Sequence, residues 1–352
     1  MAGTGLAWRS SSRPLLCRWD LDKTYLRSEF DTLRQLWRTA WERGEDKVAM
    51  PGVPEVVKAL KTAADRHGAP IATYFVSASP PQIGKAIRDK LALDGVPYDG
   101  ITFKNQLEHL KRGKFRNLRE HVGFKLGELL RGRRLVSGAA DELLFGDDWE
   151  SDPLTYSLYA DVVAGVLPAE GLGTLLRRIG VDPLVVPQLV ALAAEVRPGG
   201  RVERIFINLA RRSPPASLRV FGPRLAPTFN YFQTALVLGG MGHLDPPDVA
   251  AVGDALVRQH GYSGRRLANS LEDLVRRGLL TPHVARRVTS ALRRAQLLVP
   301  ADRPRALERL RDWGRDIRLR RRPASGVPAL DYARIFEAFP NLARTRATEG
   351  KP

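Results

Sequence analysis

Two acidic side chains stand two residues apart directly after a short apolar run. The string Asp20-Leu21-Asp22-Lys23-Thr24 follows residues 15–19, which are typical of a buried strand. At the end of such a strand, one carboxylate can act as a nucleophile while its neighbour handles protons. A string of this kind also arises by chance, and an aspartate at a strand end often only caps the next helix. The pair is therefore a candidate for covalent catalysis that needs support from the rest of the chain.

Three later segments supply the other groups that phosphoryl transfer uses. Ser77 ends the next predicted strand, where its hydroxyl could bind a phosphoryl oxygen. Lys125 lies on a later predicted helix, and its ammonium could neutralise both nucleophile and phosphate. Asp147 and Asp152 follow a third strand, and carboxylate oxygens of this kind suit Mg²⁺. Because phosphoryl transfer depends mainly on positioning and charge neutralisation, these groups together indicate that chemistry.

Some of these positions have competing interpretations. Lys125 could instead be a solvated helix lysine, and Ser79 could cap the helix that Pro80 begins. Three other lysines are rivals for the phosphate-binding role: Lys104, Lys111 and Lys114. Lys125 is favoured over these three, which are not excluded.

The elements that position these residues alternate between strands and helices, which predicts an α/β fold with a parallel sheet. Apolar runs predict strands at residues 13–22, 70–77, 101–103, 142–145 and 202–209. Helical spacing predicts helices at 28–41, 53–64, 81–93, 119–130 and 155–166, with a helical stretch on to 196. In such sheets ligands bind beyond the carboxyl ends of the strands, where the candidate residues are expected.

The ordered motif set resembles the four signature motifs of the haloacid-dehalogenase superfamily. It is more closely similar to the App1-type phosphatidate phosphatase catalytic domain family. A Pro-Gly-Val element at 51–53 lies between the first two motifs, and the second reads Val76-Ser77-Ala78-Ser79-Pro80. The acidic motif ends at Asp152-Pro153 with Tyr156 shortly after, and residues 226–238 are similar to the end of the family. The resemblance covers about residues 13–250.

The resemblance implies a role for each residue in a Rossmann-like parallel sheet of the haloacid-dehalogenase type. Asp20 would attack phosphorus, and Asp22 would protonate the leaving group and then activate water. Thr24 would brace the loop and contact the phosphate with Ser77 and Lys125. The expected Mg²⁺ ligands are Asp20, Asp22, Asp147 and Asp152. The family spacing needs only the first and last acids of the third segment, which leaves Asp148 less certain.

The chain departs from the resemblance in three places. Lys23 places a cation inside the first motif, and a helical insertion is predicted at about 168–196. A helical C-terminal extension follows the family-like part. We therefore predict a phosphatase domain at 1–250, an Arg-rich helical region at 251–322, and a linker and tail at 323–352.

Positive charge is concentrated in the C-terminal part of the chain. The 352 residues carry a formal charge of +18, and residues 256–352 hold 22 Lys and Arg against nine Asp and Glu. This asymmetry suggests an anionic membrane surface or a nucleic acid as partner. Arg-rich solvated helix faces are the competing interpretation.

Composition excludes several other classes. Cys17 is the single cysteine, which rules out an internal disulfide framework and a cysteine zinc site and fits a reducing compartment. The six histidines stand apart, without the spacing of a helical metal site. Residues 1–14 lack the apolar core of a secretory signal, and no run is long enough to span a bilayer. We therefore expect a cytoplasmic protein, with peripheral membrane attachment as an option.

The leading functional prediction is a Mg²⁺-dependent phosphatase that hydrolyses a phosphomonoester through an aspartyl-phosphate. The resemblance implies phosphatidate or another lipid phosphate as the substrate. With only residues 25–50 between the first motif and Pro51, no large cap domain is expected, so a bulky substrate would fit. The second candidate is a phosphatase of nucleic-acid ends, although aromatic residues are sparse in the basic stretch, where Trp313 stands almost alone. The third is a non-catalytic polyanion-binding protein on a vestigial phosphatase fold.

Overall fold

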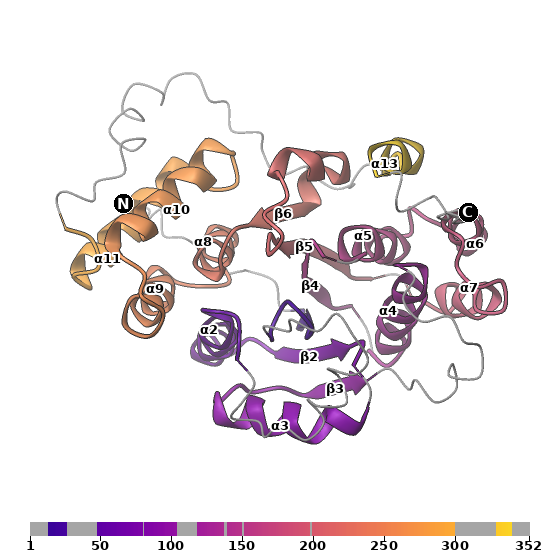
Figure 1. Cartoon of the computed structure of the whole chain (residues 1–352), viewed down its shortest axis with the longest axis horizontal. Helices are drawn as coiled ribbons and strands as arrows, with labels where there is room; N and C mark the ends of the chain where they lie inside the picture. The colour runs from indigo at the N-terminus through magenta and orange to yellow at the C-terminus, as the bar shows by residue number, and fades with distance from the viewer. Residues whose placement is uncertain are drawn as a thin grey trace, which may run out of the picture.

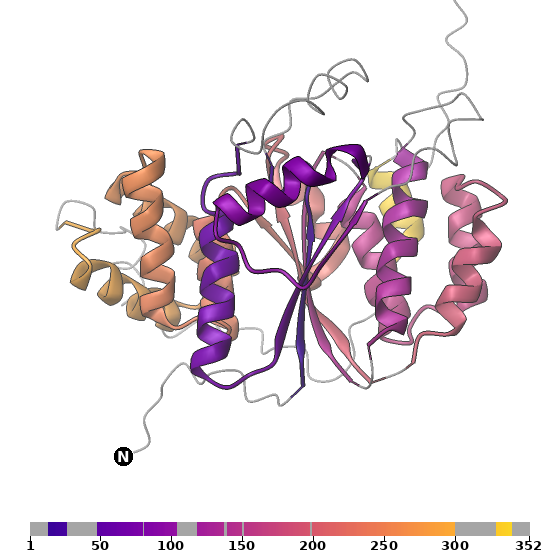
Figure 2. The same ribbon diagram turned by 90° about the horizontal axis from the view of Figure 1, so that it is seen from below.

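A parallel sheet lies between two layers of helices (Figures 1 and 2). The computed structural model describes residues 13–26, 48–79, 81–103, 118–136, 139–149, 151–197, 199–299 and 329–339. The predicted α/β class is confirmed, and the architecture is Rossmann-like. The predicted helix at 28–41 and the arginine-dense segment 301–322 lie outside the described residues.

The sheet has six parallel strands in the order β3-β2-β1-β4-β5-β6. Their bounds are β1 Leu15–Asp20, β2 Ile71–Ser77, β3 Gly100–Phe103, β4 Asp141–Asp147, β5 Arg201–Asn208 and β6 Leu225–Thr228. The central strands β1 and β4 are buried along their whole length, which explains their largely apolar runs. The sequence prediction ends with β5 and is wrong on this point. Strand β6 has four residues and contains Pro227, which a sheet tolerates at its edge.

The helices follow the strands in the predicted alternation. Between β1 and β5 they are α2 Val53–Arg66, α3 Gly84–Leu93, α4 Leu118–Arg134, α5 Asp152–Val163, α6 Ala169–Ile179 and α7 Val186–Ala194. The later ones are α8 Tyr231–Met241, α9 Pro246–His260, α10 Gly264–Arg276, α11 Pro282–Arg294 and α13 Tyr332–Ala338. Short 3₁₀ segments are η2 Pro81–Ile83 and η5 Pro215–Arg224. The helical stretch predicted at 168–196 thus consists of α6 and α7.

Each face of the sheet has its own hydrophobic core. On one face, Trp19, Phe145 and Phe206 of three adjacent strands stack on one another, with ring centroids 3.7 and 5.0 Å apart. Helices α2, α3 and α8–α11 cover this face. On the other face, Leu144, Ile205 and Ile207 pack against α4–α7, η5 and α13. The stacked rings form the centre of the core on the first face.

The C-terminal helices are packed onto this core. Residues of α9, α10 and α11 belong to the same hydrophobic cluster as Trp19 and Phe145. The domain boundary predicted after residue 250 falls inside α9. Within the predicted tail, α13 is docked: Tyr332 donates a hydrogen bond to Asp161 on α5 at 2.6 Å, and Phe336 is buried. The same carboxylate is paired with Arg224.

A buried ionic network fixes β1 against β4 below their carboxyl ends. Glu142 on β4 accepts hydrogen bonds from Arg18 on β1, from Arg133 on α4 and from the Tyr159 hydroxyl on α5. Burial acts to lower the pKa of Arg18, but Glu142, with smaller contributions from Tyr159 and Tyr74, outweighs it. The guanidinium pKa is therefore raised and its charge is retained. Asp20 is two residues beyond Arg18 on the same strand, so this network also sets its position.

Among the described residues, no helix is long and apolar enough to cross a bilayer.

Candidate active site

The candidate site lies where the strand order reverses. From β1 the chain moves to β2 and β3 on one side, and from β4 it moves to β5 and β6 on the other. Connections that diverge in this way open a crevice at the carboxyl ends of the two central strands. Asp20 is the last residue of β1 and Asp147 is the last residue of β4. The fold therefore brings two acids that are 127 positions apart to the same crevice.

Three buried carboxylates converge in this crevice. One oxygen each from Asp20, Asp147 and Asp152 lie within 4.8 Å of one another. Asp152 is the first residue of α5, and its Oδ2 accepts a hydrogen bond from the Asp147 backbone N–H at 3.2 Å. Hard carboxylate oxygens gathered at this spacing fit a divalent cation such as Mg²⁺.

Lys125 reaches this cluster from α4. Its Nζ lies 2.9 Å from Asp20 Oδ1 and 2.6 Å from Asp152 Oδ1, and its side chain is only 1% exposed. A lysine this deeply buried needs carboxylate partners, and here it has two. The structure therefore brings Lys125 to Asp20, whereas Lys104, Lys111 and Lys114 lie outside the described residues.

Asp22 lies beside the cluster with other partners. Its carboxylate accepts hydrogen bonds from the Ser77 hydroxyl at 2.9 Å and from the Ser79 hydroxyl at 2.8 Å. The group of acids that could share a metal contains Asp20, Asp147 and Asp152 without Asp22. Of the four predicted carboxylate ligands, three therefore converge in the described part of the chain, while the two serines bind the carboxylate of the fourth.

Among the described residues, Ser79 does not cap α3, and its hydroxyl has another partner. Helix α3 begins at Gly84 with Ile83 as its cap residue, and no side chain caps it. The Ser79 hydroxyl instead donates to Asp22, and its backbone N–H donates to Ser77 Oγ at 3.1 Å. The two serines of the second motif therefore act together on Asp22.

Thr24 and two buried tyrosines form hydrogen bonds with the residues around the acidic cluster. The Thr24 hydroxyl donates to Asp147 Oδ2 at 3.3 Å, and its carbonyl accepts from the Tyr231 hydroxyl at 2.7 Å. The Tyr156 hydroxyl donates to the carbonyl of Phe145 at 3.2 Å. Burial raises the pKa of both tyrosines well above its usual range, and the nearby aspartates add to the effect. Both hydroxyls therefore stay protonated and act as fixed donors.

Asp148 has a structural role outside the cluster. Its two carboxylate oxygens accept hydrogen bonds from the backbone N–H groups of Arg211 at 2.8 Å and Ser213 at 3.0 Å. Asp148 therefore ties the end of β4 to the loop after β5.

Tyr231 is the site residue that the motif set does not single out. Its only signal in the sequence is its place in the segment 226–238.

Gly146 leaves the space that the Asp152 carboxylate occupies. A Cβ atom at this position would lie 2.3 Å from Asp152 Oδ2. We expect Gly146→Ala to displace Asp152, to destabilise the fold by about 1–3 kcal/mol through overpacking, and to weaken Mg²⁺ binding. Urea unfolding and magnesium titration by calorimetry would measure these two effects.

The matched control for this change is Gly240→Ala at the end of α8. There the nearest side-chain atom would be 3.4 Å from the new Cβ, an ordinary contact. Equal stability and equal Mg²⁺ affinity of the Gly146→Ala and Gly240→Ala proteins would show that the position of Asp152 does not depend on this glycine.

Comparisons with known proteins give the chain no family. No family model matches it, and neither a curated protein nor a solved structure matches it. The haloacid-dehalogenase resemblance therefore rests on the motifs and stays a prediction.

Proposed function

We propose that this protein is a Mg²⁺-dependent phosphomonoester hydrolase of the haloacid-dehalogenase type with Asp20 as its nucleophile. One observation carries the proposal: Asp20, Asp147 and Asp152 converge with Lys125 at the strand-order reversal, with Asp22 two residues beyond the nucleophile. These are the residues whose roles the motif resemblance implies. The non-catalytic alternative assigns no chemistry to this cluster.

The chemistry follows from the positions of the side chains. The Asp20 carboxylate attacks phosphorus, the bond from phosphorus to the leaving oxygen breaks, and Asp22 supplies the proton that the leaving alkoxide takes up. Asp22 then takes a proton from water, whose oxygen attacks the aspartyl-phosphate and releases inorganic phosphate and free Asp20. The Ser77 and Ser79 hydroxyls, at 2.9 and 2.8 Å, keep the Asp22 carboxylate aimed for both transfers.

Charge neutralisation is shared between a lysine and a metal. Lys125 Nζ lies 2.9 Å from Asp20 Oδ1, where it offsets the negative charge that gathers as a phosphate approaches. Asp20, Asp147 and Asp152 would hold Mg²⁺, which supplies further positive charge to the phosphoryl oxygens when it is bound. The substrate that the resemblance implies is phosphatidate or another lipid phosphate.

Release of inorganic phosphate from an aryl phosphate tests the proposed reaction. We expect turnover in the presence of Mg²⁺ and its loss when EDTA is added, with recovery when Mg²⁺ is restored. Turnover that is unaffected by EDTA would contradict the metal requirement. Absence of turnover on the aryl phosphate, on phosphatidate vesicles and on phosphorylated nucleic-acid ends would contradict the proposal as a whole.

A further inference from the structure

Two exposed aromatic rings lie on the sheet edge that carries the candidate site. Trp149 is 43% exposed and Phe229 is 44% exposed. Among the described residues, no other Trp or Phe side chain is exposed. Trp149 follows β4 and Phe229 follows β6, so both stand at carboxyl ends of parallel strands. Asp147 pairs with Asn208, and Asn208 pairs with Thr228. The two loops are therefore two strand spacings apart, about 10 Å.

Two cations contact the first ring. The Lys23 Nζ lies 4.5 Å from the Trp149 ring centroid, and the Arg211 guanidinium carbon lies 4.6 Å from it. Lys23 directly follows Asp22 and has a φ of 62°, an uncommon backbone conformation for a residue other than glycine. The loops after β1, β4 and β5 thus meet at one indole. The Trp149 backbone N–H donates to Asp147 Oδ1 at 2.6 Å, which links this group directly to the acidic cluster.

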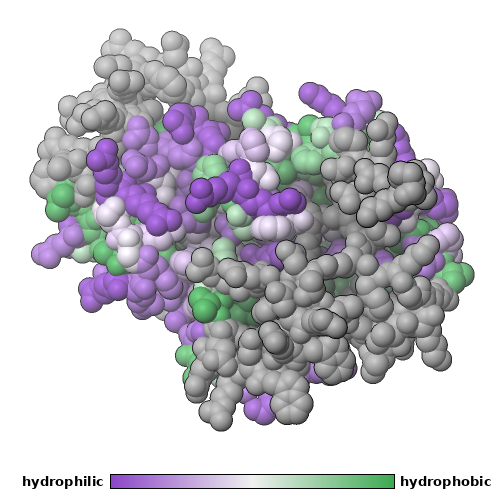
Figure 3. Space-filling model, viewed as in Figure 1, coloured by the Kyte–Doolittle hydropathy of each residue, from purple (hydrophilic) through white to green (hydrophobic). Residues whose placement is uncertain are grey.

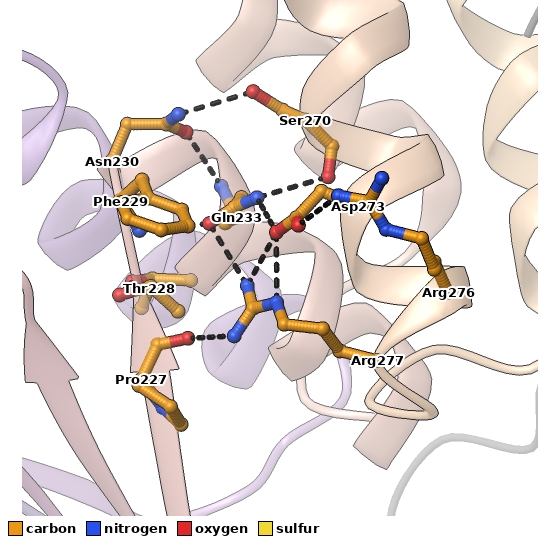
Figure 4. A network of polar contacts seen from close by, with 10 residues as sticks. Pro227, Thr228, Phe229, Asn230, Gln233, Ser270, Asp273, Arg276 and Arg277 are labelled. Atoms are coloured by element: carbon orange, nitrogen blue, oxygen red, sulfur yellow. Dashed lines mark hydrogen bonds and ion pairs between the residues drawn. The ribbon is translucent and has the colours of Figure 1, made fainter. Parts of the chain in front are cut away.

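A polar network holds the second ring in place (Figure 4). The Arg277 guanidinium carbon lies 5.5 Å from the Phe229 ring centroid, and Arg277 is fixed by Asp273 and by the Pro227 carbonyl at 2.7 Å. The Phe229 backbone N–H donates to Gln233 Oε1 at 2.8 Å. Arg277 is paired with Asp273, so its charge is already balanced. The Phe229 ring packs on this fixed guanidinium and therefore has a defined position at the surface.

Exposed rings that alternate with cations are the features that bind single-stranded nucleic acid. Bases stack on aromatic rings and on guanidinium planes, and cations follow the phosphates. We propose that Lys23, Trp149, Arg211 and Phe229 form a rim that binds the terminal nucleotides of a single-stranded nucleic acid, so that its end phosphate enters the site. This inference rests on the proposed function, and it names phosphorylated nucleic-acid ends as the substrate class.

The size and charge of the rim agree with this substrate. The distance of about 10 Å between the two loops corresponds to about three stacked nucleotides at a rise of 3.4 Å each. The rim itself contributes two cations, Lys23 and Arg211, and the chain as a whole carries a formal charge of +18, which favours a polyanion. By contrast, the described residues on the face shown in Figure 3 are mainly hydrophilic, with hydrophobic ones in small separate areas. These described residues offer little for the acyl chains of a lipid.

Binding of DNA without a terminal phosphate tests the rim independently of catalysis. We would measure fluorescence anisotropy of a labelled, unphosphorylated single-stranded octanucleotide at 50 and 200 mM salt. We expect binding that weakens at high salt and that falls about five- to 150-fold in Phe229→Leu, the range for loss of one stacked base. Arg211→Gln should weaken binding and reduce its salt dependence. Arg286→Gln, an equal loss of charge on α11, should match the parent.

Kinetics on the same proteins then tests the substrate class. We expect kcat/KM to be at least about tenfold higher for an octanucleotide with a 5′- or 3′-terminal phosphate than for an aryl phosphate, because stacking adds binding energy. Phe229→Leu and Arg211→Gln should reduce this preference. Equal kcat/KM for the two substrates, equal binding by Arg286→Gln and Arg211→Gln, or preference for phosphatidate vesicles would each overturn the inference.

Failure of the rim and failure of the proposed function give different results. Turnover of the aryl phosphate without oligonucleotide binding would leave the phosphatase proposal standing and remove the nucleic-acid rim. Oligonucleotide binding that depends on Phe229 and Arg211, without turnover of any phosphomonoester, would remove the proposed function and, with it, the substrate assignment.

Discussion

Substitution of Asp20 by asparagine is expected to reduce phosphate release by about a thousandfold or more. The amide has almost the same volume as the carboxylate, so the packing at the end of β1 should be kept. The asparagine amide is a poor nucleophile. Loss of the nucleophile removes most of the rate enhancement in enzymes that form a covalent intermediate. Initial rates on an aryl phosphate with saturating Mg²⁺, together with circular dichroism to confirm the fold, would measure the effect.

Asp89→Asn provides the matched control for this substitution. Asp89 is exposed on α3 and pairs with Lys85 at 2.8 Å, away from the cluster. We expect its rate to stay within about twofold of the parent rate, because exposed ion pairs contribute little to stability. A rate for Asp20→Asn within tenfold of the Asp89→Asn rate would exclude Asp20 as the nucleophile.

Removal of the Lys125 charge is expected to have the largest effect on stability. Its Nζ contacts Asp20 at 2.9 Å and Asp152 at 2.6 Å, and all three side chains are buried. Lys125→Met would leave these carboxylates without that counter-charge, and breaking a buried pair in this way costs about 3–5 kcal/mol. Urea unfolding in EDTA would measure the loss in free energy of unfolding.

Mg²⁺ should partly reverse that loss, because a cation bound among the three aspartates replaces some of the missing charge. For the parent, Mg²⁺ at 100 times its dissociation constant should add about 2.7 kcal/mol. Lys85→Met serves as the control, because Lys85 is exposed and its pair with Asp89 should contribute at most about 1 kcal/mol. If Lys125→Met and Lys85→Met unfold at the same urea concentration, Lys125 does not balance the acidic cluster.

Much of the sheet and of the site could be predicted, for a physical reason. Central parallel strands are buried on both faces, so β1, β2, β4 and β5 appear as apolar runs with sharp ends. The carboxyl ends of parallel strands share one edge, so motifs after those runs must meet there. For this reason the sequence predicts that Asp20, Ser77 and Asp147, which are far apart in the chain, lie close together.

The parts that could not be predicted depend on contacts between distant segments. Strand β6 is short and contains Pro227, so it lacks the periodic signal. The Tyr231 hydroxyl bonds to the carbonyl of Thr24, 207 positions away, and no local pattern encodes that contact. Ser77 and Ser79 are visible in the sequence as polar residues at a strand end, but their hydrogen bonds to Asp22 could not be predicted from it.

The exposed aromatic residues show the same limit. The sequence directs attention to the basic C-terminal stretch, where Trp313 lies outside the described residues. Trp149 and Phe229 instead stand on the edge of the sheet, and their cations come from other loops. A pairing of ring and cation across strands is visible only once the fold is known.

Chemical trapping of the phosphorylated enzyme tests the role of Asp20 most directly. The parent protein would be mixed with Mg²⁺ and an aryl phosphate, quenched during turnover and treated with borohydride, which reduces an acyl phosphate to an alcohol. We predict that mass spectrometry finds this reduction at position 20 and at no other aspartate, and that it disappears when substrate is omitted. Steady phosphate release with an unmodified Asp20, or with the reduction at another acid, would contradict the proposed mechanism.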